Sequence, residues 1–298
     1  MNRSTRISDV VTGAPAIMGV LAVIVALTLG LVGCGIGAAA WAKPAAARSR
    51  VLAPGPGRIH ISFAPANGKT AKHGKAVWQS TAVRRFVAAV NARLTLPVNL
   101  EVRFRPGDSI DAPAGRGQPM FLGYNDPGDN RQIFQLFGVL TPSGKILHPR
   151  DRGRGQKILS QAVKQFEPAI AMHELGHVFT VWWPIPTTSN NEEIADLFSA
   201  WVDVKLMHDP QALLMLANYR LAVAALQKRR LPGIAAANQA QGYQDLARLA
   251  IAKPSWRKGI QKFLPKGYLT TNWSGFLGGQ FSGLERALQP IARIPLGG

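Results

Sequence analysis

Residues 173–177 read His173-Glu174-Leu175-Gly176-His177, and this pentapeptide gives the strongest indication of the fold. A helix has 3.6 residues per turn, so two histidines four positions apart lie on one face and can bind a single ion. Glu174 lies beside that face, where its carboxylate can reach a metal-bound water rather than the metal. Zinc hydrolases use this arrangement, with a further carboxylate ligand from elsewhere in the chain. The alternative is a pair of core histidines bonded to backbone carbonyls.

The segment around this motif has the periodicity of a buried helix. Apolar residues recur every three or four positions and continue into the two histidines: Leu159, Val163, Phe166, Ile170, His173 and His177. The histidines therefore fall on the buried stripe, which favours a metal site over solvated side chains. Pro168 is expected either to begin the helix at that point or to kink a longer one.

A second helix is expected to follow a short loop and to supply the third ligand. The loop is indicated by Pro184, Pro186 and the polar residues 187–191, and apolar residues recur at helical spacing after it. Glu192 and Asp196 lie four positions apart on this second helix and share a face. One carboxylate can bind the ion while the other hydrogen-bonds a liganding imidazole.

Glu192 is the expected third ligand, and Glu193 is the fallback, because helix starts inferred from sequence are uncertain by about two residues. The carboxylates could instead belong to a capping box, formed either by Ser189 with Glu192 or by Asn190 with Glu193. The second of these boxes leaves Glu192 able to bind a metal, so capping and metal binding are compatible.

These motifs resemble those of a bacterial metallopeptidase family with an otherwise uncharacterised domain, and of the wider gluzincin group of zinc peptidases. The likeness lies in the pentapeptide, the Pro-containing loop and the run Glu192-Glu193-Ile194-Ala195-Asp196. Upstream, Val90-Asn91-Ala92-Arg93-Leu94 and Tyr124-Asn125-Asp126-Pro127 are also similar to the family, so the resemblance covers roughly residues 80–220.

The resemblance implies a zincin-like fold in which Zn²⁺ is held by His173, His177 and Glu192. It further implies that Glu174 is the general base and that Asp196 hydrogen-bonds a zinc ligand, His173. The chain departs from the family in lacking cysteines in the body of the domain and an acidic-His segment further downstream. A transition-state role for a downstream His or Tyr is therefore unassigned.

The remaining pattern predicts an α+β architecture for one domain that spans residues 58–298. We expect a small mixed sheet packed on the zinc-binding helix, followed by a mainly helical C-terminal lobe with Gly-rich breaks. The run Gln132–Leu140 is apolar and aromatic and is expected to be an edge strand to which a substrate could add. The other expected elements are strands at 58–63 and 98–104, a helix at 81–94, and a helix from Asp209-Pro210 to about 227.

The N-terminal residues 1–42 have the features of an export signal or a membrane anchor. Arg3 and Arg6 precede a stretch without charges that runs from residue 10 to 42. Three fates are open: lipidation at Cys34 in Leu31-Val32-Gly33-Cys34, cleavage after Ala40-Trp41-Ala42, or retention as an anchor helix in which Cys34 is simply a small apolar residue. Each fate places the bulk of the chain in the cell envelope, outside the cytoplasm. Residues 43–57 are rich in Pro, Ala and Gly and predict a linker.

The formal net charge of +19 predicts attraction to anionic surfaces such as wall polymers or lipid headgroups. Nucleic acid is not an expected partner, because no stretch interleaves aromatic with basic residues as single-strand binders do. The expected partner is a peptide or protein substrate, and the expected activity is that of a zinc metallopeptidase. The alternative is a non-catalytic envelope protein whose zinc site is structural or vestigial. Structural sites are closed by four protein ligands, and the other four histidines lie outside the motif.

Overall fold

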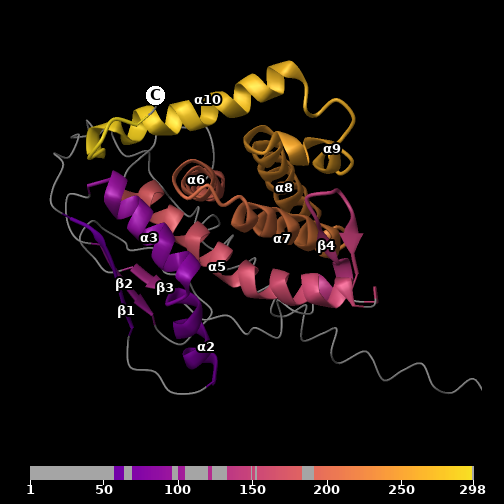
Figure 1. Cartoon of the computed structure of the whole chain (residues 1–298), viewed down its shortest axis with the longest axis horizontal. Helices are drawn as coiled ribbons and strands as arrows, with labels where there is room; N and C mark the ends of the chain where they lie inside the picture. Colours follow the sequence, from indigo (N-terminus) through magenta and orange to yellow (C-terminus); the bar gives the residue numbers. More distant parts are fainter. Residues whose placement is uncertain are drawn as a thin grey trace, which may run out of the picture.

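The computed structural model describes residues 57–63, 69–95, 100–104, 120–122, 133–148, 150–151, 153–182 and 191–296. Helices dominate these residues, and two small sheets complete a broadly α+β fold (Figure 1). The expected signal or anchor, Cys34 and nearly all of the linker lie outside the described residues. In the part of the chain that is described, no helix combines the length and hydropathy needed to cross a bilayer.

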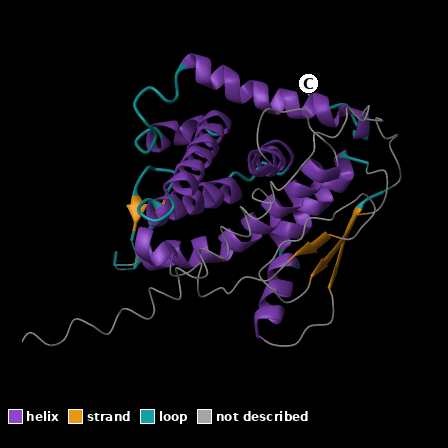
Figure 2. Ribbon diagram, turned by 180° about the vertical axis from the view of Figure 1, so that it is seen from behind, coloured by secondary structure: helices purple, strands orange, loops and turns teal. Residues whose placement is uncertain are grey.

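The larger sheet is wholly parallel, with strand order β1 (Ile59–Phe63), β2 (Leu100–Phe104) and β3 (Met120–Leu122). The strands expected near residues 58–63 and 98–104 are thus confirmed. A separate antiparallel pair is formed by β4 (Val139–Leu140) and β5 (Ile146–Leu147). The expected single mixed sheet is therefore wrong, and the two sheets lie at opposite ends of the molecule (Figure 2).

Two helices follow β1, namely α2 (Lys69–Trp78) and α3 (Thr81–Arg93), and the second confirms the helix expected at 81–94. The Ser80 side chain caps α3 by accepting a hydrogen bond from the backbone N–H of Val83. On the same helix, the Asn91 side chain bonds both backbone groups of Ile59: its Oδ1 accepts from the N–H at 2.8 Å and its Nδ2 donates to the carbonyl at 3.1 Å. These two bonds tie β1 to α3.

The strand expected at Gln132–Leu140 is wrong for most of its length. Residues 133–137 are helical, and only β4 is extended. Gly138 ends the helical turn with φ 73°, a backbone conformation that glycine adopts without a Cβ clash, and its N–H bonds the carbonyl of Phe134 at 2.8 Å. Ile133 and Phe134 are buried in the core, so they do not form an open edge for a substrate.

The longest helix is α5 (Arg154–Trp182), which runs through Pro168 without ending there. Of the proposed stripe, Leu159, Phe166, His173 and His177 are buried. Helix α6 (Asn191–Trp201) crosses α5 closely, because Gly176 carries no side chain: a Cβ at this position would lie 2.6 Å from the carbonyl oxygen of Ala195. A single π-helical segment, η1 (Val202–Leu206), continues α6.

The C-terminal part is helical, as expected. The expected helix after Asp209-Pro210 is α7 (Gln211–Gln227), and the Asp209 side chain accepts from the N–H of Gln211 at 3.3 Å. Beyond it lie α8 (Pro232–Ala252), the 3-10 turn η2 (Pro254–Trp256), α9 (Arg257–Ile260), α10 (Thr271–Leu288) and the 3-10 turn η3 (Gln289–Ile291). The expected Gly-rich breaks do not include the glycines at 275, 278, 279 and 283, which lie inside α10.

The core joins the helices that carry the motifs. Aromatic rings link its parts: the ring centroids of Phe134 and Phe166 are 5.1 Å apart, and those of Phe166 and Tyr219 are 4.7 Å apart. Phe198 of α6 contacts Phe86 of α3 on the other side, with centroids 6.3 Å apart. The facing parts of α5, α6 and α7 are therefore held by apolar packing on both sides.

Candidate metal centre

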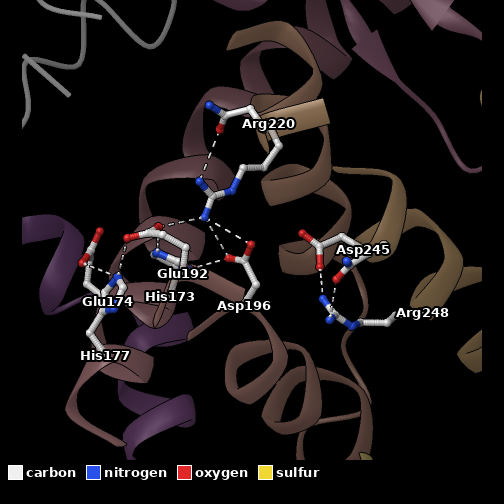
Figure 3. Close-up of polar contacts among 10 residues, drawn as sticks. His173, Glu174, His177, Glu192, Asp196, Arg220, Asp245 and Arg248 are labelled. Atoms are coloured by element: carbon white, nitrogen blue, oxygen red, sulfur yellow. Dashed lines mark hydrogen bonds and ion pairs between the residues drawn. The ribbon is translucent and has the colours of Figure 1, made fainter. Parts of the chain in front are cut away.

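Three side chains from α5 and α6 meet in a group that could hold a metal ion: His173, His177 and Glu192 (Figure 3). The carboxylate of Glu192 lies between the two imidazoles. Its Oε2 is 3.3 Å from His173 Nε2, and its Oε1 is 3.3 Å from His177 Nε2. Among the described residues this group contains Glu192 and not Glu193, so the structure favours the expected ligand over the fallback.

The spacing of these atoms suits a small divalent cation. Ligand atoms that sit about 2.0–2.2 Å from a tetrahedral ion are roughly 3.3–3.6 Å from one another. The two contacts of Glu192 with the imidazoles, each 3.3 Å, match this spacing, and all three ligand atoms lie within 4.8 Å of one another. His173 Nε2 is buried, and its contact with Glu192 Oε2 at 3.3 Å is long for a hydrogen bond. A metal ion bound by both atoms would give each of them a closer partner.

Asp196 fixes the orientation of His173. Its Oδ1 lies 2.5 Å from His173 Nδ1, on the side of the ring opposite to the Glu192 contact. A carboxylate at this position holds the proton on Nδ1 and leaves Nε2 as the metal-binding nitrogen. The structure therefore brings Asp196 into contact with the ligand that the resemblance implied.

Glu174 lies beside the group, with Oε2 3.7 Å from His177 Nε2. Its side chain is buried, and neither carboxylate oxygen has a hydrogen-bond partner. Burial raises the pKa of Glu174, and the charges of His177 and His173 oppose this increase. A buried carboxylate with a raised pKa and two unused oxygens is suited to accept and return a proton.

Arg220 of α7 connects the two carboxylates of α6, and sequence reasoning missed it. Its Nη2 donates to Glu192 Oε2 at 3.2 Å and to both oxygens of Asp196 at 3.1 Å, while Nη1 donates to Asn238 Oδ1 at 3.3 Å. Only 3% of Arg220 is exposed. The signal in the sequence is a single cation within the apolar run 212–226, since a buried arginine requires acidic partners.

The electrostatics of the group favour positive charge at its centre. Burial lowers the pKa of His173, but the charge and hydrogen bond of Asp196 and the hydrogen bond of Glu192 outweigh it and raise the pKa to about 10. Burial also opposes ionisation of Glu192, yet hydrogen bonds from His173 and His177 hold its pKa well below the usual value. The site thus attracts a cation strongly, whether a proton or a metal ion.

A second buried pair lies next to this network, formed by Asp245 and Arg248 of α8 (Figure 3). Arg248 Nη1 donates to Asp245 Oδ1 at 2.6 Å, and its Nη2 donates to Gln280 Oε1 of α10 at 3.1 Å. Burial, together with the negative charge of Asp196, raises the pKa of Asp245 to about 7. Sequence reasoning did not single out this pair, whose residues are separated by one helical turn.

Tyr219 precedes Arg220 on α7, and the charges of Glu174 and Glu192 influence its pKa. Its hydroxyl is buried and has no hydrogen-bond partner. Burial raises the pKa of Tyr219 to about 12, and the carboxylates of Glu174 and Glu192 add to this increase. The phenol therefore remains protonated and is a hydrogen-bond donor at neutral pH.

Comparison with known proteins assigns no family to the chain. No family model matches its sequence, and neither a curated protein nor a solved structure is significantly similar to it. What the chain does must therefore be argued from the geometry of the group formed by His173, His177 and Glu192.

Proposed function

We propose that this protein is a zinc-dependent peptidase of the bacterial cell envelope with a zincin-like fold. One observation carries the proposal: the Glu192 carboxylate lies 3.3 Å from each of two imidazole nitrogens, and beside them lies the buried carboxylate of Glu174, which has no hydrogen-bond partner. The two histidines and Glu192 are the ligand set of a catalytic zinc site, and Glu174 is the base. The envelope location is inferred from residues 1–42.

Zinc bound by these three residues supplies Lewis acidity, which activates water and polarises an amide carbonyl. The chain's own residues then move the protons. Glu174 accepts a proton from the attacking water on a carboxylate oxygen and returns it to the departing nitrogen of the amide. Asp196 keeps the His173 ring in one orientation throughout, and Arg220 holds Asp196 and Glu192 in place.

Deep burial of the group supports a second candidate, a structural metal site in a non-catalytic envelope protein. His173 and Glu174 are only 2% and 3% exposed. A structural zinc site is closed by four protein ligands, whereas the group in the described part of the chain contains three. The catalytic proposal is therefore preferred, and an assay that separates metal binding from turnover distinguishes the two.

The test uses the full chain and two substitutions in α5. Glu174→Gln is expected to retain bound zinc and to lose peptide cleavage by about 10²–10⁴-fold, the usual contribution of a general base. His177→Ala is expected to lose both the zinc and the activity. Metal content is measured by mass spectrometry, and cleavage is measured on a mixed peptide library with and without chelator.

Glu167→Gln is the matched control, because Glu167 lies on α5 seven residues before Glu174 and outside the metal-holding group. This control should cleave like the unmodified protein. Normal cleavage by Glu174→Gln would overturn the mechanism. Full zinc content without cleavage by any variant, including the unmodified protein, would favour the structural site.

A further inference from the structure

We propose that a second site, independent of the metal centre and of the proposed peptidase activity, binds a phosphate monoester that carries an apolar body. The site is a cavity of about 830 Å³ between β1, α3 and the C-terminal segment. This volume lies within the range of small-molecule sites, roughly 300–1,000 Å³. None of its lining residues belongs to the group formed by His173, His177 and Glu192.

Three arginines from distant parts of the sequence meet at this cavity. Arg58 precedes β1, Arg84 lies on α3, and Arg293 follows η3 near the C-terminus. Among the described residues, the lining contains no aspartate or glutamate. Arg84 and Arg293 come from separate elements, so one anion bound in the cavity could accept hydrogen bonds from both side chains.

Arg293 is held in place by contacts within the protein. The segment after η3 is attached to the end of α3 by a bridge between Leu94 and Ala292 and by the N–H of Arg293, which donates to the carbonyl of Arg93 at 2.8 Å. Arg293 Nε donates to the carbonyl of Leu94 at 3.1 Å. This bond uses one edge of the guanidinium and orients its two Nη groups, which reduces the entropy lost on binding.

Other residues of the lining are also held in place, and most of them are apolar. Asn91 lines the cavity and is held by its two hydrogen bonds to Ile59. Ile59 and Trp78 also line it and are only 3% and 5% exposed, so they belong to the core rather than to a mobile surface. A lining that combines arginines with aromatic and aliphatic side chains suits a ligand with an anionic head and an apolar body.

Phosphate fits the three cations better than carboxylate does. A phosphate monoester carries a charge of about −1.5 to −2 at neutral pH and has three acceptor oxygens, whereas a carboxylate has one charge and two oxygens. Guanidinium groups bind phosphate through paired hydrogen bonds. A soluble phosphate ester and the headgroup of a phosphatidic acid share this chemistry, so the experiment must separate these two sources.

The experiment measures binding to the full chain in a non-ionic detergent by titration calorimetry at constant ionic strength. EDTA is present throughout, so that no signal arises from a metal ion. Phenyl phosphate and dihexanoyl phosphatidic acid, used below its micellar concentration, are the two probes, and benzyl alcohol is the uncharged control. We expect saturable binding of at least one phosphate probe and none of benzyl alcohol. A lipid probe that binds at least about tenfold more tightly than phenyl phosphate identifies the ligand as a headgroup; otherwise the ligand is a soluble ester.

The matched variants are Arg84→Gln and Arg85→Gln, which are neighbours on α3 and remove the same charge. Arg84 lines the cavity, whereas Arg85 contacts Asp209 at 3.8 Å and does not. Arg84→Gln and Arg293→Gln should each weaken binding by about tenfold or more, while Arg85→Gln should change it less than about twofold. Equal loss in Arg84→Gln and Arg85→Gln, or no saturable binding of either phosphate probe to the unmodified chain, would overturn the proposal.

Discussion

A guanidinium group that is 97% shielded from water must be paired, and Arg220 is paired with Glu192 and Asp196, two carboxylates that contact the histidines. Its charge matters most for Asp196. Burial opposes the ionisation of Asp196, and the charge of Arg220 is the largest influence that lowers its pKa. Without Arg220, the pKa of Asp196 is expected to rise, and its carboxylate should hold the His173 ring less firmly.

Arg220→Gln is therefore expected to weaken zinc binding by about 10–100-fold, the usual cost of losing a residue that supports a metal ligand. Arg220→Lys keeps the charge but loses the forked donor geometry. Its zinc affinity should therefore lie between those of the unmodified protein and Arg220→Gln. The measurement is competition for zinc with a chromophoric chelator. Arg248→Gln is the control, because Arg248 is equally buried but bonds Asp245 instead. Equal weakening by both substitutions would show a general loss of stability rather than a role for Arg220.

Asp203 is predicted to make the stability of the protein depend on pH. Its side chain is 1% exposed, and its Oδ1 has no hydrogen-bond partner. Burial, with the charges of Asp209 and Asp245, raises its pKa well above 3.8. The folded chain then binds this proton more tightly than the unfolded chain. The contribution of Asp203 to stability is fully present below the unfolded pKa and is lost as the pH rises toward the folded pKa.

Asp203→Asn removes the free-energy cost of ionising a buried carboxyl. The free energy of unfolding of this variant should therefore exceed that of the unmodified protein by about 1–3 kcal/mol at pH 8. The gain should be smaller at pH 5. Urea unfolding followed by circular dichroism at the two pH values measures both differences. An identical difference at pH 5 and pH 8 would contradict the assigned ionisation.

For single residues, the sequence predicted the positions of side chains that lie one turn apart on the same helix. The spacing of His173 and His177, and of Glu192 and Asp196, is set by helical periodicity, and both pairs lie as expected. Arg220 could not be placed, because it reaches the site from a third helix 28 residues beyond Glu192. Only tertiary packing determines which carboxylates such a cation meets.

At the scale of helices, the site depends on how closely α5 and α6 approach each other. Gly176 and Ala195 lie at their contact, where a Cβ on Gly176 would be 2.6 Å from the Ala195 carbonyl oxygen and 2.8 Å from its Cα. Real Cβ atoms do not approach backbone so closely, so any side chain here must move one helix. Because the histidines are on α5 and Glu192 is on α6, such a movement changes the distance between the ligands.

Gly176→Ala is thus expected to weaken zinc binding and to destabilise the fold by about 1–3 kcal/mol, the cost of overpacking a core. Gly278→Ala is the matched control within α10, where an added Cβ meets no atom within 4 Å. This control should leave zinc binding unchanged and stabilise the helix by up to about 1 kcal/mol. Thermal unfolding and zinc competition measure both variants, and normal zinc affinity in Gly176→Ala would contradict this account.

The element predictions were right for the helices at 81–94 and after Asp209-Pro210 and for two short strands, and wrong for most of Gln132–Leu140. In residues 133–137 the apolar positions 133, 134, 136 and 137 fit a helical turn as well as a strand, and a run of this length does not distinguish them. In α10 each glycine disfavours a helix by about 1 kcal/mol. Packing of Phe281, Leu284 and Leu288 into the core holds the helix nonetheless.

For the whole molecule, burial makes the outer surface more basic than the composition indicates. Among the described residues, the buried acidic side chains are Glu174, Asp196, Asp203 and Asp245, whereas the buried basic ones are Arg220 and Arg248. The excess of cations is thus concentrated on the outside of a chain whose formal charge is +19. This distribution supports the expected attraction to anionic envelope polymers or lipid surfaces.

Metal binding is predicted to stabilise the entire fold, because the ligands come from α5 and α6, and Arg220 connects them to α7. An ion present at 1,000 times its dissociation constant adds about 4 kcal/mol of stability if it binds only the folded chain. Adding zinc should raise the melting temperature of the full chain, and EDTA should lower it. His177→Ala should respond to neither, and a melting temperature insensitive to EDTA in the unmodified chain would exclude tight metal binding.

The Asn91 side chain occupies backbone groups at the edge of the parallel sheet. β1 is the outermost strand of the parallel sheet, and the backbone N–H and carbonyl of Ile59 on it are both taken by one side chain. Outermost strands with unpaired backbone groups recruit strands from other molecules and begin aggregation. Asn91 takes the place of a neighbouring strand at Ile59, so this residue of β1 cannot pair with a strand of another molecule while the two bonds hold.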